Sequence, residues 1–368
     1  MKLSFKYDFK RKDLLYGGII TAIIAVIALV LILIGLSTEV FDPIGRAIDE
    51  FSISDSFFFS KTKRHSDCAD LNPGIVLIDI ADCDSRQEIA DIVCKINDAS
   101  PKLLAVDIIF GEYSSSSSFS DSLLVRAFQS SRNLVLAERF VNGENGWYSE
   151  RSFFADDIPC IEGDVNFQYG IVRTFEDEYV AGMAHIPSFV SLIASQAGIC
   201  NGFKKQLINY SPVNTITIPA DYTGSFDIVR EQIVILGDAG DLRDYHDIPV
   251  LINGQSRTSG LRIIAQCLYT LQPGNGFVTC PNWLALVIGI VLTYLFCAFI
   301  ASPMFRVDRF NGLWTSIWQV IVLLLLVALT YLLFWGFHFC MPLKYWLIGV
   351  GFSNLATDFF YFVKPKSF

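Results

Sequence analysis

Residues 74–109, GIVLIDIADCDSRQEIADIVCKINDASPKLLAVDII, contain two strands and a helix that set the fold class of the middle of the chain. Gly74–Ile80 and Leu103–Ile109 are apolar runs rich in β-branched residues, and each run follows a proline that predicts a chain break. Between them, Arg86–Asp98 carries its apolar residues at helical spacing. This strand–helix–strand order predicts a right-handed crossover between parallel strands.

Elements of the same kind continue toward the C-terminus. After a flexible loop of five serines, Ser114–Ser118, the pattern predicts helices at Asp121–Phe128, Ser188–Ala197 and Ser259–Leu271, and strands at Asn133–Ala137 and Gln232–Leu236. We therefore predict an α/β domain with a largely parallel or mixed sheet.

Long apolar segments flank this domain on both sides. Residues 17–36, 283–301 and 313–337 are long enough to cross the roughly 30 Å hydrocarbon core of a bilayer as helices. Residues 339–363 form a weaker fourth span, interrupted by Lys344 and Asp358. We expect a base of one N-terminal and three C-terminal membrane helices, with residues 38–281 as one large domain between them.

Basic residues in the short flanking segments predict the orientation. The N-terminal tail 1–16, the loop after the second span and the C-terminal tail 364–368 are enriched in Lys and Arg. The positive-inside rule places all three in the cytoplasm and residues 38–281 outside it. We favour an uncleaved signal anchor over a cleaved signal peptide, because the apolar stretch is long and no A-x-A-like site follows Leu36. The outer placement holds in either case.

Composition and charge exclude several classes of protein. A mean hydropathy of +0.44 with 18% charged residues indicates a membrane protein, and the net charge of −9 argues against nucleic-acid binding. Acidic residues strongly outnumber basic ones in residues 38–281, which favours cationic ligands or divalent ions. The alternative, which we prefer, is a well-solvated extracytoplasmic surface. Seven cysteines fall in this region, and spacing alone cannot pair them as disulfides: Cys68, Cys83, Cys94, Cys160, Cys200, Cys267 and Cys280.

No established catalytic motif is present. The sequence has no phosphate-binding loop of the form GxxxxGK[ST], no HExxH and no GxSxG, and only four His. We therefore predict neither an enzyme nor a cofactor.

A dense acidic loop follows the predicted strand 232–236. Gly237–Asp247, GDAGDLRDYHD, brings together five candidate ligand-binding residues: Asp238, Asp241, Asp244, His246 and Asp247. Loops beyond the carboxyl ends of strands bind ligands in open α/β sheets, and carboxylates with a histidine could hold a cation or a polar ligand. The alternative is a solvated loop whose Asp side chains cap backbone groups.

Aspartates also end the first two predicted strands. Asp79 and Asp107 lie at near-equivalent positions in their apolar runs, and Asp82 and Asp84 follow the first run. They could line the same sheet edge as the acidic loop and bind ligand there, or they could cap helices and order the loops.

A polar stripe interrupts the fourth apolar segment. Helical spacing places Ser353 next to Thr357 and Asn354 next to Asp358. Polar side chains in a membrane need partners, so this stripe is a candidate contact with another protein or helix, although interfacial solvation of Asp358 is the alternative.

Several segments together resemble one family. GIVLIDI, LLAVDIIFGE, SDSLLVRAF, NLVLAERF, GDVNFQYGIVRTF, QIVILGDAGDLRDYHDIPV and SGLRIIAQCLYTL are similar, in order and placement over residues 50–275, to the type-two CHASE domain, the cyclase/histidine-kinase-associated sensory extracellular domain. The membrane layout agrees with that family. A Trp- and Pro-rich stretch common after the first strand is missing. Family members usually continue into a kinase, cyclase or other output domain, which we do not expect in this chain after the last span.

The resemblance implies a sensor or adaptor of the bacterial cytoplasmic membrane that senses a ligand or protein outside. Because the cytoplasmic segments are too short to fold independently, we expect output through a separate signalling or effector protein, with homo-oligomerisation possible. The alternatives are a constitutive scaffold for a protein complex and, with less support, an extracytoplasmic metal-dependent enzyme.

Overall fold

The computed structural model describes residues 11–37, 55, 58, 73–113, 118–143, 146–167, 170–181, 184–252, 254–301, 311–342 and 344–363. The chain divides into two compact units. We call residues 55–277 the α/β unit, and residues 1–54 together with 278–368 the helical unit. Residues 1–10 of the N-terminal tail, the loop 302–310 and the C-terminal tail 364–368 fall outside the described residues, as do Cys68 and residues 114–117 of the serine loop. Residues 11–16, expected as part of the N-terminal tail, belong instead to helix α1 (Arg11–Ser37).

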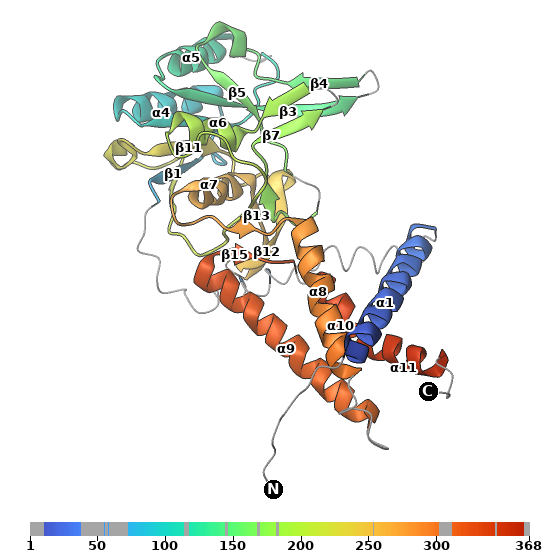
Figure 1. Cartoon of the computed structure of the whole chain (residues 1–368). Coiled ribbons are helices and arrows are strands. Elements are labelled where there is room, and N and C mark those ends of the chain that lie inside the picture. The colour runs from blue at the N-terminus through green and yellow to red at the C-terminus, as the bar shows by residue number, and fades with distance from the viewer. Residues whose placement is uncertain are drawn as a thin grey trace. The chain divides into compact units, whose positions relative to one another are not determined.

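The α/β unit is built on a seven-stranded mixed sheet (Figure 1). All neighbouring strands pair in parallel except β3 and β4, which form an antiparallel hairpin. In spatial order the strands are β10 (Ile216–Pro219), β1 (Ile75–Asp79), β11 (Ile233–Gly237), β2 (Leu103–Asp107), β3 (Leu134–Gly143) and β4 (Gly146–Glu150), with β5 (Ile161–Asp164) on the other side of β3. The predicted α/β class is confirmed.

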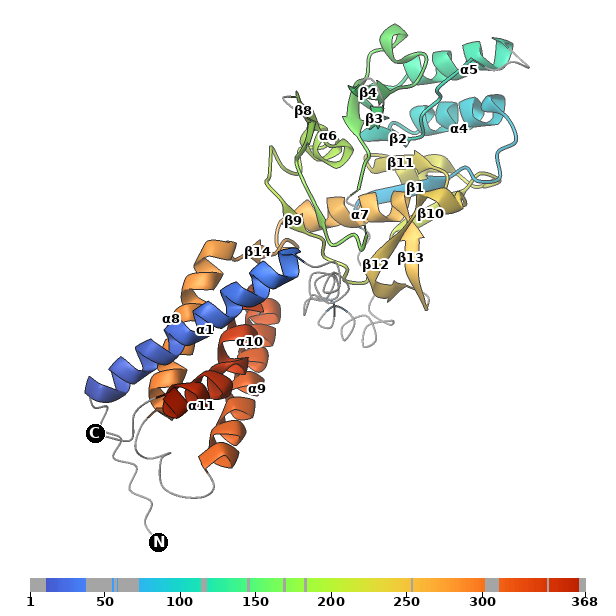
Figure 2. The same ribbon diagram turned by 90° about the vertical axis from the view of Figure 1, so that its right-hand side faces the viewer.

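Helices cover both faces of the sheet. Helices α4 (Arg86–Asp98) and α5 (Ser118–Gln129) pack together on one face. The other face is covered by α6 (Phe189–Gln196), which contacts β3 and β5, and by α7 (Gly260–Leu271), which contacts β1 and β11. Figure 2 shows α4 and α5 above the strands and α7 below them. Ser118 begins α5, so the prediction that all five serines form a loop is wrong at that residue.

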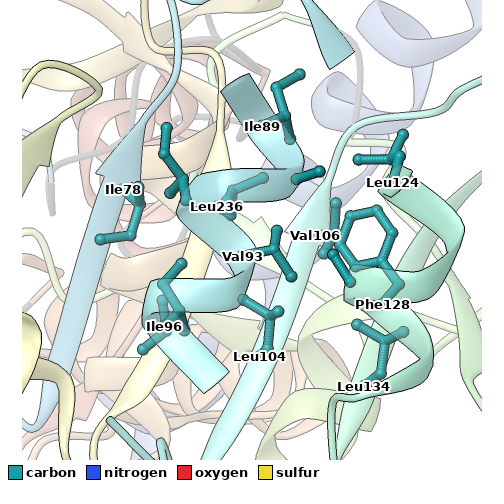
Figure 3. Close-up of a cluster of buried hydrophobic side chains, with 14 of the residues drawn as sticks. Ile78, Ile89, Val93, Ile96, Leu104, Val106, Leu124, Phe128, Leu134 and Leu236 are labelled. Carbon is teal, nitrogen blue, oxygen red and sulfur yellow. The ribbon is translucent and has the colours of Figure 1, made fainter. Parts of the chain in front are cut away.

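Helix α4 illustrates how local sequence and core packing agree. Ser85 caps its N-terminus by accepting a hydrogen bond from the Glu88 N–H, and the Glu88 carboxylate accepts one from the Asp84 N–H in return. Its apolar stripe is buried against β1, β11 and β2, together with residues of α5, as Figure 3 shows: Ile89, Val93 and Ile96 of α4, Leu124 and Phe128 of α5, and Ile78, Leu104, Val106 and Leu236 of the strands.

Smaller elements extend the unit beyond the sheet. They comprise three antiparallel pairs, β6 (Thr174–Phe175) with β9 (Gln206–Leu207), β7 (Glu178–Ala181) with β8 (Ala184–Pro187) and β12 (Tyr245–Ile252) with β13 (Gln255–Ser259), and three 3₁₀ turns, η2 (Ala155–Asp157), η3 (Phe226–Val229) and η4 (Leu242–Asp244). The hairpin β7–β8 lies between β5 and α6 in the chain and was not predicted.

The described part of the helical unit contains four helical stretches long and apolar enough to cross a membrane. They lie in α1 (Arg11–Ser37), α8 (Asn282–Ile300), α9 (Asn311–Phe337) and the pair α10 (Lys344–Gly351) and α11 (Ser353–Val363). A short parallel pair, β14 (Val278–Thr279) with β15 (Phe339–Cys340), joins the segment before α8 to the segment after α9. The described cysteines of both units are free thiols.

The fourth apolar segment differs from the expected helix 339–363 in two ways: residues 339–340 form β15, and the helix that follows is interrupted by one turn residue. The helix breaks at Phe352, between α10 and α11. Gln319 of α9 donates hydrogen bonds of 2.7 Å to the carbonyl oxygens of Val350 and Gly351, and Ser353 Oγ donates a further one to Val350. These side-chain donors satisfy backbone oxygens at the interruption of the helix.

Candidate functional site

The sheet register brings the predicted strand-end aspartates to one edge. Asp79 of β1 pairs with Gly237 of β11, and Gly237 pairs with Asp107 of β2, so both aspartates flank the start of the acidic loop. The sequence could not indicate that β11 lies between β1 and β2, because 125 residues or more separate β2 from β11. The prediction that these residues share one edge is confirmed; whether any of them binds a ligand stays a prediction.

Asp79 holds two loops together. Its Oδ1 accepts hydrogen bonds from the backbone N–H of Ala81, at 3.1 Å, and of Ala239, at 3.0 Å. The first closes the turn after β1 and the second ties that turn to the loop after β11. The carboxylate therefore serves backbone groups of both loops, which is the capping alternative for this residue.

The aspartates of the acidic loop also accept backbone hydrogen bonds. Asp238 Oδ1 accepts from the N–H groups of Gly240 and Asp241, and Asp244 Oδ2 accepts from the N–H of Gly260, at 2.9 Å, where α7 begins. Asp241 caps η4 and binds the Arg243 guanidinium, whose hydrogen bonds lower the pKa of Asp241. These contacts order the loop and the start of α7.

The remaining candidates do not converge on one point. His246 Nε2 lies 3.5 Å from Asp244 Oδ1, and its ring meets the Phe167 ring edge to face at 5.2 Å. Asp247 Oδ1 lies 3.5 Å from the Arg257 guanidinium, and Asp82 is exposed to solvent. Among the described residues, no three or more His, Cys, Asp or Glu side chains are grouped so that they could hold a metal ion.

Asp107 differs from its neighbours because its carboxyl makes no hydrogen bond or ion pair within the described part of the chain. Burial and, secondarily, the nearby negative charge of Asp244 raise the pKa of Asp107 to about 7. This carboxyl can therefore gain or lose a proton near neutral pH. Such a group at the carboxyl edge of a parallel sheet is a candidate functional residue.

The main cavity of the α/β unit lies farther along the same sheet, beyond the parallel pairing of β3 with β5, which ends at Glu138 and Asp164. Its volume is about 850 Å³, which suits a small organic molecule. The walls come from the β3–β4 hairpin, the segments after β5, strands β6 and β7, the start of α6, and Ile264 of α7. Side chains that define its chemistry are Arg139, Phe140, Trp147, Glu150, Asp164, Phe167, Phe175, Glu176, Glu178, Tyr179, Ser188 and Phe189.

Asp164 ends β5 at the base of this cavity and is only 3% exposed. Its Oδ1 accepts hydrogen bonds from the Phe140 N–H, at 3.1 Å, and the Asn166 side chain, at 2.8 Å. Burial raises the pKa of Asp164, and these hydrogen bonds oppose the rise because they stabilise the carboxylate. Asp164 thereby joins β3 to the segment that follows β5.

None of the cavity residues was predicted from the sequence. Asp164 ends a strand as Asp79 and Asp107 do, but its strand reads IEGD, in which Glu162 and Gly163 interrupt the apolar run. The Gly163–Asp164 pair after a short strand is the only local signal that could have found it. Trp147 and Glu178 lie in the short strands β4 and β7. The alternation of apolar and polar residues in these strands is too short to predict a strand from the sequence.

The predicted polar stripe on α11 divides into two parts. Ser353 and Thr357 donate to carbonyl oxygens of Val350 and Ser353 in their own chain segment. Asn354 donates to Gln319 Oε1 of α9, at 2.5 Å, and to Ser316 Oγ, at 3.2 Å, whereas Asp358 is exposed. Asn354 thus joins helices within the chain, and Asp358 is the stripe residue that remains accessible to a partner.

Comparison with protein-family models matches residues 24–301 to the CHASE2 domain. The matched range begins within α1, includes the whole α/β unit and ends just after α8. Comparisons with curated proteins and with solved structures gave no significant match. The family-model match confirms the resemblance found in the sequence segments between residues 50 and 275. Because it covers well over half of the chain, the chain belongs to the CHASE2 domain family, whose members are extracellular sensory domains rather than catalytic ones.

Proposed function

We propose that this chain is a membrane sensor that binds a small ligand in the cavity beyond β3 and β5 and passes the signal to a separate partner protein. The cavity is the observation that carries the proposal. It lies at the carboxyl end of parallel strands, the usual ligand position in open α/β sheets, and it combines apolar walls with a few polar groups.

The connections to the helical unit supply a route for the signal. The α/β unit follows α1 in the chain and precedes α8, and these two helices pack closely. A Cβ atom built on Gly17 would lie 2.7 Å from Ala298 Cβ, so the helix backbones meet at this point. A ligand that binds one conformation of the α/β unit more tightly than the other would shift the chain toward that conformation. If the two conformations place α1 and α8 differently, binding would move these helices relative to each other.

Orientation is part of the proposal. The α/β unit lies outside the cytoplasm and both termini lie inside it, in the cytoplasmic membrane of a bacterium. This arrangement rests on the extracellular character of the family, on the four apolar segments and on the basic flanks.

A screen on the full-length chain in lipid nanodiscs tests ligand sensing. Small organic molecules of mixed charge are added while the thermal unfolding midpoint of the α/β unit is recorded by circular dichroism. We expect ligands of the cavity to raise the midpoint, because binding to the folded state stabilises it. The variant Val165→Trp narrows the cavity and should lose the effect, whereas Ile228→Trp, at an exposed residue of η3 outside the cavity lining, should keep it.

Two results would contradict the proposal. One is that no molecule stabilises the wild-type chain. The other is that ligands stabilise Val165→Trp as strongly as Ile228→Trp, which would place their site outside the cavity.

A further inference from the structure

The cavity beyond β3 and β5 has an aromatic rim contributed by two separate hairpins. Trp147 of β4 and Tyr179 of β7 contact each other edge to face, with ring centroids 6.1 Å apart. Both remain accessible, with 43% of Trp147 and 37% of Tyr179 exposed. Exposed faces of Trp and Tyr attract organic cations, and Trp does so most strongly.

The charges of the lining are predominantly negative. Four carboxylates, Glu150, Asp164, Glu176 and Glu178, face a single basic residue, Arg139. The guanidinium of Arg139 binds Glu150 through two nitrogen atoms, at 2.8 and 2.5 Å, and is therefore already neutralised. The lining thus holds no free basic group among its described residues that could bind an anionic ligand.

Two of the four carboxylates have no Lys or Arg partner among the described residues. Glu176 is bound by Lys205 at 3.0 Å. Among the described residues, Asp164 and Glu178 form no ion pair with Lys or Arg, and the nearest basic atom to Glu178 Oε1 is His185 Nδ1 at 2.9 Å. Glu178 and Tyr179 both line the cavity, so a carboxylate without a Lys or Arg partner and the aromatic rim belong to the same lining.

The start of α6 does not reverse this preference. A helix N-terminus attracts anions, and Ser188, the cap of α6, lines the cavity. Ser188 is however bridged through its backbone to Asp164, and its hydroxyl accepts a hydrogen bond from Ser191 N–H. The Ser191 N–H, one of the backbone donors at this helix end, is therefore already bound within the chain.

The deeper wall is apolar. Phe175, Phe189 and Val190 are at most 6% exposed in the absence of a ligand, and Ile264 of α7 completes this wall. An inorganic or strongly hydrated cation would find few ligands here, since the described residues hold no metal-binding group. An organic cation with a ring or hydrocarbon body could pack its apolar part against this wall, while its charged group contacts the aromatic rim and the carboxylates of the lining.

We infer that the cavity binds small organic cations that carry an aromatic or apolar body. The inference rests on the proposed function, since it names the ligand class of the same cavity. Trp147 and Tyr179 would contact the cationic group, Glu178 and Asp164 would balance its charge, and Phe175, Phe189 and Ile264 would enclose its apolar body.

Three probes of one shape and different charge test the ligand class. Calorimetric titration of the full-length chain in zwitterionic nanodiscs compares 2-phenylethylammonium, neutral 2-phenylethanol and anionic 3-phenylpropionate, with empty nanodiscs as the blank. We expect the cation to bind at least tenfold more tightly than the alcohol, and the anion to bind most weakly. Ethylammonium, which lacks the ring, should bind far more weakly than the aromatic cation.

Matched variants assign the preference to residues. Glu178→Gln should reduce the advantage of the cation over the alcohol about threefold to tenfold while leaving the affinity for the alcohol unchanged. Trp147→Leu should weaken binding of the cation more than tenfold. Asp221→Asn removes an exposed carboxylate outside the lining and should change nothing, which controls for net charge.

The outcomes separate this inference from the proposed function. Equal affinity for cation and alcohol, or tighter binding of the anion, would overturn the ligand class while leaving the cavity as a binding site. An undiminished cation preference in Glu178→Gln and Trp147→Leu would also overturn it. If neither these probes nor any molecule of the mixed-charge screen bound, the proposed function itself would fail.

Discussion

Asp79 Oδ1 accepts a hydrogen bond from the backbone N–H of Ala239 at 3.0 Å, across 160 positions of sequence. The same oxygen accepts from Ala81, so one carboxylate joins the turn after β1 to the loop after β11. Proximity of these residues was predicted from their positions at strand ends. The structure adds that the contact orders backbone groups of both loops.

Asp79 should therefore matter for stability, in contrast to Asp82 three residues later. Asp79→Ala leaves the N–H groups of Ala81 and Ala239 without this acceptor and should lower the free energy of unfolding by about 1–2 kcal/mol. Asp82 is exposed, so Asp82→Ala should change the free energy of unfolding by less than about 0.5 kcal/mol. Thermal unfolding of the full-length variants measures both values. Equal effects of the two substitutions would show that Asp79 is not the clamp we describe.

The raised pKa of Asp107 predicts a specific pH dependence. The carboxyl titrates at about 7 in the folded chain and at its ordinary value of 3.8 in the unfolded chain, so the folded state binds more protons between these values. The free energy of unfolding should therefore fall as the pH rises from about 4 to about 7, and level off above that range. Asp107→Asn removes the titration and should stabilise the chain at pH 8, on the order of 1–4 kcal/mol, with little effect at pH 4. A stability difference from wild type that is constant between pH 4 and pH 8 would contradict this assignment.

Close packing of α1 on α8 predicts different tolerance at two adjacent glycines. A Cβ on Gly17 would lie 2.7 Å from Ala298 Cβ, whereas a Cβ on Gly18 would lie 3.8 Å from the Tyr294 ring. Gly17→Leu should separate the helices and lower the stability of the helical unit by about 1–3 kcal/mol, while Gly18→Leu should be tolerated. Unfolding in a graded series of denaturing detergent measures this difference. Similar stability of the two variants would argue against the packing shown here.

Two residues of the α11 stripe should behave differently in the membrane. Asn354→Leu loses the hydrogen bonds to Gln319 and Ser316 of α9 and should destabilise the helical unit by about 1 kcal/mol. Asp358→Leu should leave stability unchanged, because Asp358 is exposed. If the stripe contacts a partner protein, Asp358→Leu should reduce the amount of that protein recovered with the chain from native membranes. Undiminished recovery would exclude Asp358 from the contact.

The proposed orientation predicts the activity of reporter fusions. A reporter that works only outside the cytoplasm should be active at position 200, and one that works only in the cytoplasm should be active at position 308 and after Phe368. The basic flanks are the physical reason. An inactive cytoplasmic reporter after Phe368, with an active one at position 308, would mean that the broken fourth segment does not cross the membrane.

The sequence alone was sufficient for elements whose signals are local. Helix α4 begins at Arg86 and ends at Asp98 as predicted, because its cap and its apolar stripe lie within the same short segment. Strands β1 and β2 and the long apolar helices α1, α8 and α9 followed in the same way from continuous apolar runs. Each of these patterns depends on neighbouring residues only, so one sequence shows it directly.

Tertiary structure decided which elements meet. Three relationships join residues far apart in the chain. Strand β11 lies between β1 and β2, and Trp147, Asp164 and Glu178 line one cavity. Gln319 of α9 donates a hydrogen bond to the Val350 carbonyl near the end of α10. No periodicity or local propensity encodes such pairings, because they depend on long-range strand order and on the burial of faces against one another. The sheet edge that carries Asp79 and Asp107 could therefore be predicted, because each aspartate ends a recognisable strand. The cavity could not, because its residues come from short hairpins and loops that meet only in the folded chain.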